Sequence, residues 1–307
     1  MQLIRGLHHS PPYLSGCALT IGNFDGVHLG HQAILRHLRQ KANALNLPMA
    51  VMLFEPQPRE YFMGDRAPAR LMRLRDKLHY LADAGVDVVI AKFDRTFANL
   101  PAEQFIEDWL VRKLNVKFLS IGDDFKFGAK RLGNFAMLQQ AGKRFGFEVE
   151  DSRTFCLDEL RISSTAIREA LAKDDLQHAQ NLLGKPYRIL GRVIHGNKLG
   201  RTIGFPTANV RLHRQVNPVK GVYAVKVRLK SGEIFNGVAN MGKRPTINGT
   251  IQLLEVHLFD FSENIYGQMV EVEFCQKIRD EIKFPSFEAL KAQIEQDVKT
   301  AKAFFAK

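Results

Sequence analysis

The sequence predicts a parallel α/β domain followed by a small antiparallel β domain that ends in a helix. Strand-like and helix-like segments alternate as far as about residue 152, which is typical of a parallel sheet with helices on both faces. From about Tyr187 the segments are short and rich in β-branched or aromatic residues, with Gly, Asn and Ser between them, and this pattern predicts an antiparallel sheet or barrel. We place the domain boundary at Lys185–Pro186, which gives domains 1–185 and 186–307.

Each element is predicted from its hydrophobic period. In the first domain we expect strands at 17–24, 49–54, 86–93, 116–122 and 147–152, with helices at 31–45, 69–85, 101–115 and 135–146. In the second domain we expect strands at 187–196, 221–229, 233–242, 253–261 and 269–276. Residues 286–306 form one amphipathic pattern, and Pro285 and Ser286 are suitable residues for its start.

Composition limits the class of protein. The chain has 307 residues, of which 45% are hydrophobic, and it contains no apolar stretch of about 20 residues that would span a membrane. Its three cysteines, Cys17, Cys156 and Cys275, are far apart, which favours free thiols in a reducing compartment over a disulfide framework. We therefore expect a cytoplasmic protein without membrane partners.

The net charge of +12 permits two kinds of partner, nucleic acid or a small polyanion such as a nucleotide. The charge divides into +4 before Pro186 and +8 after Lys185, without a long basic block or zinc-finger spacing. A small anionic ligand fits this pattern at least as well as RNA. Our prediction is small-molecule substrates and no nucleic acid.

The segment "LTIGNFDGVHLGHQAIL" places His28 and His31 three residues apart where a predicted strand passes into a helix. As zinc ligands they would need at least one more protein ligand, and only Asp25 is near in the sequence. Three glycines in the same turn indicate phosphate binding instead, because they let backbone N–H groups approach an anion at a helix start. The alternative is an ordinary helix start with two histidines.

A second segment, "RISSTAIREAL", offers three hydroxyls followed by Arg168. Taken by itself, this segment favours a helix cap slightly over a binding site. Together with the histidine motif, hydroxyls, helix-start amides and an arginine are suitable for a triphosphate.

These two motifs together resemble the nucleotidylyltransferase superfamily. The neighbouring "GNFDGVHLGHQ", "FEPQPREYF" and "GDDFKFG" are similar to the FMN adenylyltransferase module of bacterial bifunctional riboflavin kinase/FAD synthetases. The resemblance implies that His28, His31 and Arg168 are catalytic and that FMN phosphate attacks the α-phosphorus of ATP, releasing pyrophosphate. It implies further ATP contacts at Gly22, Asn23, Phe24, Gly30, Ser163, Ser164 and Thr165.

The same resemblance implies flavin contacts at Phe54, Asp124 and Phe127. For such phenylalanines core packing is an equally good interpretation. The loops depart from the family pattern, because Gln57, Lys126 and Asn134 stand where His, Arg and Asp are frequent. These departures concern flavin contacts rather than the reaction.

A further set of candidate residues begins with "GNKLGRTIGFPTANV", which is rich in glycine and basic residues. By itself it is typical of a hairpin loop, with Pro206–Asn209 as a turn. Thr207 and Asn209 also carry the neutral oxygens that a hard cation prefers. Glu255 lies within an apolar strand, where it is either a salt-bridged residue or a general base.

This region resembles the riboflavin kinase module of the same family through "GRTIGFPTAN", "GVYAV", "NGVANMGKRPT", "LEVHLFDF", "YGQMVEVEF" and "IRDEIKFPSFEALKAQIEQD". The resemblance implies Mg²⁺ on Thr207 and Asn209, and Glu255 as the base for the riboflavin 5′-hydroxyl. It implies ATP contacts at Lys198, Gly200 and Thr207, and flavin contacts at Arg279 and Phe284, with Ile282 where a Lys is frequent. The implied fold is a Rossmann-like nucleotidylyltransferase domain followed by a six-stranded β-barrel.

The combined prediction is an enzyme that makes FMN from riboflavin and ATP and then FAD from FMN and ATP, with Mg²⁺ as cofactor. We expect a monomer or weak oligomer. Three alternatives remain open: a kinase that has lost its adenylyltransferase site, an adenylyltransferase for another acceptor, and an RNA-binding protein, for which tight, salt-dependent binding without turnover is expected.

Overall fold

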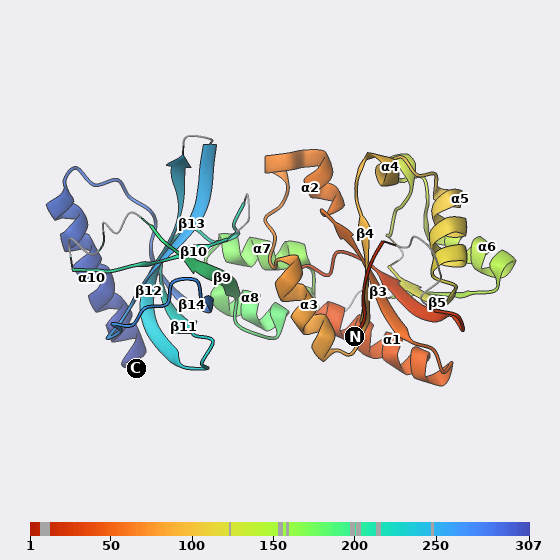
Figure 1. Cartoon of the computed structure of the whole chain (residues 1–307), viewed down its shortest axis with the longest axis horizontal. Helices are drawn as coiled ribbons and strands as arrows, with labels where there is room; N and C mark the ends of the chain where they lie inside the picture. Colours follow the sequence, from red (N-terminus) through yellow and green to blue (C-terminus); the bar gives the residue numbers. More distant parts are fainter. Residues whose placement is uncertain are drawn as a thin grey trace. The chain divides into compact units, whose positions relative to one another are not determined.

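A computed structural model describes residues 1–6, 13–122, 124–152, 156–157, 160–196, 200, 204–212, 216–246 and 249–307. The chain forms two compact units (Figure 1). The first contains Met1–Pro68 and Met72–Ser163, and the second contains Ala69–Leu71 and Ser164–Lys307. The predicted boundary of the functional domains, between 185 and 186, stays a prediction, because compact units and functional modules are not defined in the same way.

The first unit is built on a six-stranded sheet in the order β1-β4-β3-β2-β5-β6, in which every neighbouring pair is parallel. Its strands are β1 (Leu3–Arg5), β2 (Cys17–Ile21), β3 (Met49–Glu55), β4 (Asp87–Lys92), β5 (Val116–Ile121) and β6 (Glu148–Asp151). Starting from β2, the chain adds β3 and β4 on one side of the sheet and then β5 and β6 on the other side. The strand order therefore reverses between β2 and β5, and ligands of open parallel sheets bind at this point, beyond the carboxyl ends of the strands.

Helices connect these strands, and two hydrophobic clusters fill the faces of the sheet. One cluster joins the sheet to α1 (Leu29–Ala44) and α3 (Leu74–Asp83), and the other joins it to the π-helix η2 (Phe105–Lys113) and α6 (Phe135–Phe145). This arrangement confirms the predicted parallel sheet with helices on both faces. The smaller elements are α2 (Pro58–Met63), η1 (Gly64–Arg66), α4 (Arg95–Ala98), α5 (Ala102–Gln104), η3 (Ala129–Arg131), β7 (Cys156–Leu157) and β8 (Leu160–Arg161).

The helix predicted at 69–85 is shorter in the structure, because α3 begins only at Leu74. The preceding residues are held by polar contacts of another kind, among them a hydrogen bond from the Met72 amide to Asp25 Oδ1 (3.1 Å). Hydrophobic period alone does not reveal such a competing partner for the backbone. The edge strand β1 was also missed, since three residues are too few to show a period.

The second unit contains a closed barrel in the strand order β10-β13-β12-β11-β14-β9. Its strands are β9 (Arg188–Ile194), β10 (Ala208–Arg211), β11 (Gly221–Arg228), β12 (Ile234–Thr246), β13 (Gly249–Leu258) and β14 (Met269–Arg279), all paired antiparallel. The six-stranded barrel is confirmed. Strand β10 corrects the reading of Pro206–Asn209 as a turn, because Ala208 and Asn209 already pair with β13.

Successive side chains of a strand point to opposite faces, so the barrel wall has two distinct faces. One face carries fully buried apolar residues, including Tyr223, Val225 and Leu254. The opposite face of β11 and β12 carries Val222, Ala224 and Val238, which pack against the C-terminal helix α10 (Phe287–Phe305). Ser286 caps this helix by accepting a hydrogen bond from the Ala289 amide (3.2 Å), as the sequence predicts.

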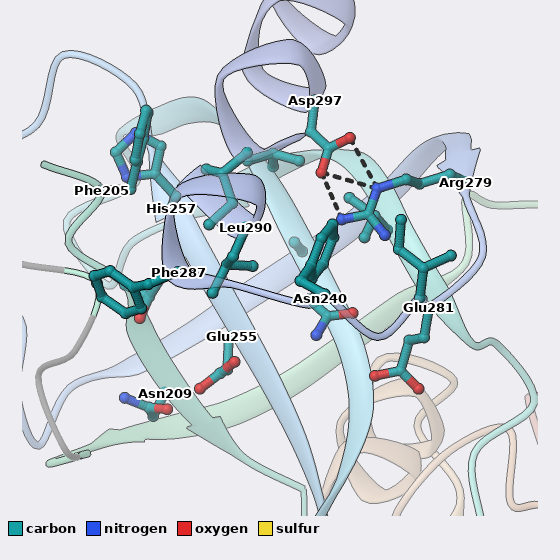
Figure 2. Close-up of a pocket in the computed structure, with 18 residues that line it drawn as sticks. Phe205, Asn209, Asn240, Glu255, His257, Arg279, Glu281, Phe287, Leu290 and Asp297 are labelled. Atoms are coloured by element: carbon teal, nitrogen blue, oxygen red, sulfur yellow. Dashed lines mark hydrogen bonds and ion pairs between the residues drawn. The ribbon is translucent and has the colours of Figure 1, made fainter. Parts of the chain in front are cut away.

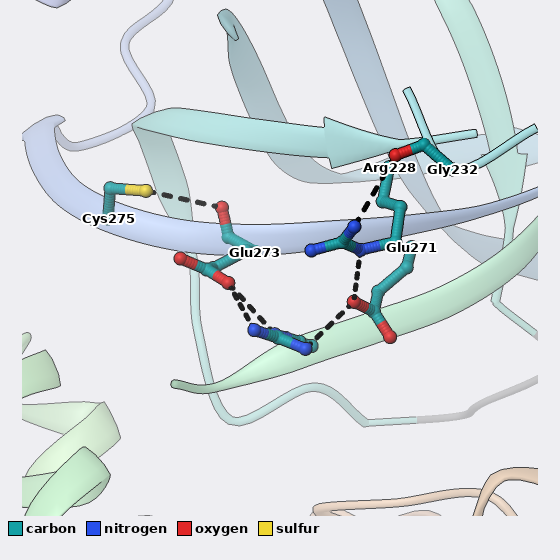
Figure 3. Close-up of polar contacts among 6 residues, drawn as sticks. Arg228, Gly232, Glu271, Glu273 and Cys275 are labelled. Atoms are coloured by element: carbon teal, nitrogen blue, oxygen red, sulfur yellow. Dashed lines mark hydrogen bonds and ion pairs between the residues drawn. The ribbon is translucent and has the colours of Figure 1, made fainter. Parts of the chain in front are cut away.

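Ion pairs support the pairing of β9 with β14 (Figure 3). The Arg188 guanidinium reaches Glu271 (3.0 Å) and Glu273 (2.8 Å), and Arg228 on β11 also approaches Glu271. Cys275 lies beside this group and donates a weak hydrogen bond to the Glu273 carbonyl (3.7 Å). Burial raises the pKa of the Cys275 thiol to about 11, so this cysteine is protonated at neutral pH and its place here is structural.

Two helices precede the barrel in the second unit, α7 (Ser164–Ala172) and α8 (Leu176–Leu183). Asp174, in the turn between them, accepts hydrogen bonds from Tyr223 Oη (2.6 Å) and Lys277 Nζ (2.8 Å). Since Tyr223 is fully buried, this contact joins the helix pair to β11 and β14 of the barrel.

Candidate active sites

The loop between β2 and α1 has an unusual backbone. Phe24, Gly26 and Val27 have φ angles of 46°, 87° and 42°. For a β-branched residue such as Val27 this left-handed conformation costs on the order of 1–3 kcal/mol, and such strain gathers at functional sites. The loop lies where the strand order reverses between β2 and β5, which is the place where a ligand is expected on a parallel sheet.

His28 and His31 lie together at the start of α1. His28 is the N-cap, and its Nδ1 accepts a hydrogen bond from the His31 amide (3.3 Å). The two rings stack with centroids 3.6 Å apart, and Phe24 stacks on His31 at 4.6 Å. Because Nδ1 of His28 is an acceptor, the neutral ring carries its proton on Nε2. The predicted pair thus exists and combines an imidazole N–H with the positive end of a helix.

Two buried charged residues, one in the loop and one on α3, hold the loop in place. Asp25, which is 2% exposed, accepts the hydrogen bond from the Met72 amide described above. Lys77, also 2% exposed, donates from Nζ to the carbonyl of Asn23. Sequence reasoning missed Lys77, because a lysine in a predicted helix shows no sign of burial. Gly30 lets the backbone of α1 lie close to the His28 ring and the Ile162 carbonyl, because a Cβ at this position would crowd both groups.

The predicted flavin residues of this unit lie near the carboxyl ends of β3 and β5, the two strands that flank β2. Phe54 is on β3 and packs against Phe93 (5.9 Å) and Phe97 (5.5 Å). After β5, Asp124 is exposed, whereas Phe127 is buried and stacks with Phe125 at 5.6 Å. Phe127 is therefore part of the core and the half-buried Phe54 packs against the same cluster, and their flavin contact stays a prediction.

Two of the residues that depart from the family pattern have local structural roles. Asn134 caps α6 by accepting a hydrogen bond from the Met137 amide (3.0 Å). Gln57 is the N-cap of α2, and its backbone N–H donates to Glu60 Oε2 (3.0 Å). Lys126 is exposed.

The hydroxyl segment is divided between the units. Ser163 ends the first unit, whereas Ser164, Thr165 and Arg168 belong to α7 in the second. Arg168 Nε donates to the Ala69 carbonyl (2.6 Å). The helix is confirmed, and the joint action of these residues with the histidines stays a prediction.

On the barrel, one row of side chains crosses five neighbouring strands. Asn209 on β10 is directly opposite Glu255 on β13, which is opposite Asn240 on β12. The row continues with Val222 on β11 and Arg279 on β14. Directly opposed residues of an antiparallel pair point to the same face, and all five side chains line one cavity.

This cavity has a volume of about 350 Å³ and lies between the barrel wall and α10 (Figure 2). Figure 2 shows the Glu255 carboxylate between the amides of Asn209 and Asn240. The Oδ1 atoms of both asparagines are buried and have no hydrogen-bond partner in the part of the chain that the structure describes. The apolar lining comes mainly from Phe205, Phe284, Phe287, Leu290, Ile294 and Ile282.

A buried ion pair fixes the arginine of this cavity. Arg279 donates to Asp297 on α10 from Nε (2.9 Å) and Nη2 (2.7 Å), and Gln293 Nε2 donates to the same carboxylate (2.9 Å). The guanidinium also lies over the Phe284 ring at 5.6 Å. The two predicted flavin residues of the barrel are therefore in contact. The sequence did not identify Asp297, which is 3% exposed.

Thr207 lies at the border of two cavities. It lines the cavity below α10 and a second one of about 380 Å³ next to Tyr266. His257 Nδ1 hydrogen-bonds to the Pro206 carbonyl (2.9 Å), which fixes the approach to Thr207. Gly200 lines the first cavity, whereas Lys198 lies outside the described residues.

The described part of the chain contains no group of three or more His, Cys, Asp or Glu side chains placed to hold a metal ion. No helix in the same ranges is long and apolar enough to cross a membrane.

The parallel sheet with its histidine loop and the barrel with Glu255 in its row of side chains together define a two-unit enzyme of phosphate transfer. Comparison with known proteins specifies its family. The FAD synthetase family model matches residues 10–166, and the riboflavin kinase model matches residues 183–305. The bifunctional riboflavin kinase/FMN adenylyltransferase of Haemophilus influenzae is 82% identical over 99% of both chains. That of Escherichia coli K12 is 57% identical over 99% of this chain and 98% of its own.

Among solved structures, one from Streptococcus pneumoniae that is described as a macrolide-efflux protein is 31% identical, with a TM-score of 0.79 and 97% of each chain covered. The chain belongs to the bifunctional riboflavin kinase/FMN adenylyltransferase family. This membership confirms the predicted family, the two activities and the use of ATP and flavins as substrates.

Proposed function

We propose that the barrel makes FMN at Glu255 and that the parallel-sheet domain adenylylates FMN at His28 and His31. The domains would be residues 1–185 for the adenylyltransferase and 186–307 for the kinase. The observation that carries the kinase assignment is the row in which Glu255 lies between two buried amide oxygens that have no hydrogen-bond partner among the described residues, in a largely apolar cavity.

The two cavities that meet at Thr207 suit a reaction with two substrates. The cavity below α10 holds Glu255, aromatic rings and Arg279, so it suits riboflavin, whose ring is flat and largely apolar. ATP would then occupy the second cavity and point its γ-phosphate toward Thr207. Glu255 takes the proton of the 5′-hydroxyl, the hydroxyl oxygen bonds to the γ-phosphorus, and the bond to ADP breaks.

Magnesium fits the neutral oxygens next to Glu255. The Asn209 side chain is 6% exposed, and its Oδ1 is a buried acceptor for which the structure describes no partner. Together with the Thr207 hydroxyl it offers the oxygen ligands that Mg²⁺ prefers. When bound, the ion would neutralise charge on the phosphate oxygens of ATP.

For the second activity, the loop residues Gly22, Asn23, Phe24 and Gly30 would surround ATP phosphates at the start of α1. His28 would donate from Nε2 to the charge that develops on the α-phosphoryl group, with His31 beside it. The FMN phosphate oxygen bonds to the α-phosphorus and pyrophosphate leaves. Ser164, Thr165 and Arg168 would bind the β- and γ-phosphates, and Ser163 would be a further ATP contact. Phe54, Asp124 and Phe127 would contact the flavin.

We propose a monomer or weak oligomer that acts in the cytoplasm on small molecules, without nucleic-acid or membrane partners. Support comes from the sequence, in which the positive charge is dispersed, and from Cys17, which is buried as a free thiol whose pKa burial raises to about 12.

One time course tests the function. Purified protein with riboflavin, ATP and Mg²⁺ should form FMN and then FAD, separated by chromatography. Formation of neither product would refute the proposal. FMN without FAD would leave a kinase alone, and added EDTA should stop both steps if Mg²⁺ is required.

A further inference from the structure

Asn240 shares the surroundings of Asn209 but has no role in the steps described above. It lies on β12 directly opposite Glu255, on the side away from Asn209. Its Oδ1 is buried in the cavity wall without a hydrogen-bond partner in the described ranges. A buried acceptor left unpaired is costly, and native proteins rarely keep one without a ligand to satisfy it.

The order of the row indicates what this ligand is. On one side of Glu255 are Asn209 and then Thr207, and Thr207 also lines the second cavity, where the phosphates are proposed. On the other side, beyond Asn240, are Val222 and Arg279 with Phe284, where the flavin ring is proposed. A riboflavin molecule whose terminal hydroxyl is at Glu255 and whose ring is near Arg279 must therefore lead its ribityl chain past Asn240.

We propose that Asn240 binds an inner hydroxyl of the ribityl chain and thereby selects flavins with a polyol side chain. This inference rests on the proposed kinase site. Opposed residues of an antiparallel pair have Cβ atoms about 5 Å apart, which matches the spacing between a terminal hydroxyl and one further along a polyol. An amide both donates and accepts, as a hydroxyl does. Asn240 is thus a specificity residue, whereas Glu255 takes the proton.

The test compares riboflavin with its 2′-, 3′- and 4′-deoxy analogues in the wild-type protein and in Asn240→Ala. Wild type should use one analogue about tenfold less well than riboflavin in kcat/KM, because one hydrogen bond is lost. Asn240→Ala should lose about tenfold with riboflavin but show no further loss with that same analogue. An equal loss with all four substrates would overturn the proposal.

Two controls separate this result from general damage. Asn236 is on the same strand but exposed, so Asn236→Ala should leave all four values unchanged. The KM for ATP should be the same in Asn240→Ala and wild type if the barrel is intact, and a raised KM for ATP would count against a role limited to the flavin. If the proposed kinase function itself is wrong, the wild-type protein forms no FMN from riboflavin, which is a different result.

Discussion

The two candidate sites would bind phosphate by different means. In the parallel-sheet unit the groups are consecutive in the chain: backbone amides, a helix start and two stacked histidines within Gly22–His31. In the barrel the groups are side chains from separate strands, brought together by the pairing of Asn209, Glu255 and Asn240. The first site depends on the conformation of one loop, and the second depends on strand register. Changes to backbone and to side chains should therefore affect the two activities differently.

The largest effect should come from Glu255→Gln, which keeps the size of the side chain but removes its basicity. We expect FMN formation to fall by about 10²–10⁴-fold, the usual contribution of a general base. FAD formation from added FMN should be unchanged, as measured by chromatography of the two products. A variant that loses both activities equally would show that the two sites are not separate.

The opposite effect is expected from His28. Since alanine would also remove the N-cap of α1, His28→Asn is the better variant, because asparagine keeps a capping oxygen. FAD formation from FMN should fall by about 10²–10³-fold, the usual cost of losing one donor to a developing charge. FMN formation should stay at the wild-type rate, and retention of full FAD synthesis would exclude His28 from the chemistry.

These two sites also differ in how far the sequence predicted them. His28 and His31 are local, so their motif was visible and the structure places them together. Glu255 and Asn209 were identified through resemblance, but Asn240 was not, because a residue's partners across a barrel depend on register rather than on spacing. The same limit applies to Lys77 and Asp297, whose burial follows from tertiary packing. The fold class was predictable because hydrophobic period is strong in both halves.

A smaller effect is expected in the barrel from Asp297→Asn, which leaves the Arg279 guanidinium without its charged partner. Removing one member of a buried ion pair typically costs about 3 kcal/mol, so thermal unfolding followed by circular dichroism should occur at lower temperature. The KM for riboflavin should rise more than the KM for ATP. Asp260→Asn is the matched control, because the Asp260 carboxylate pairs with Lys302 of the same helix (3.8 Å) but is exposed and lines neither cavity, and it should change neither the unfolding temperature nor the two KM values.

The smallest effect tests the backbone side of the comparison. Gly26 has a φ of 87°, and an alanine there costs about 1–2 kcal/mol in the left-handed region. Gly232, in the turn between β11 and β12, has a φ of 97° with open space around it, so Gly232→Ala carries the same backbone cost away from both sites. Both variants should lose similar stability, but only Gly26→Ala should slow FAD formation, by about fivefold or more at that cost. If both variants slowed FAD formation alike, the loop conformation would matter only for folding, and the contrast between a backbone site and a side-chain site would fail.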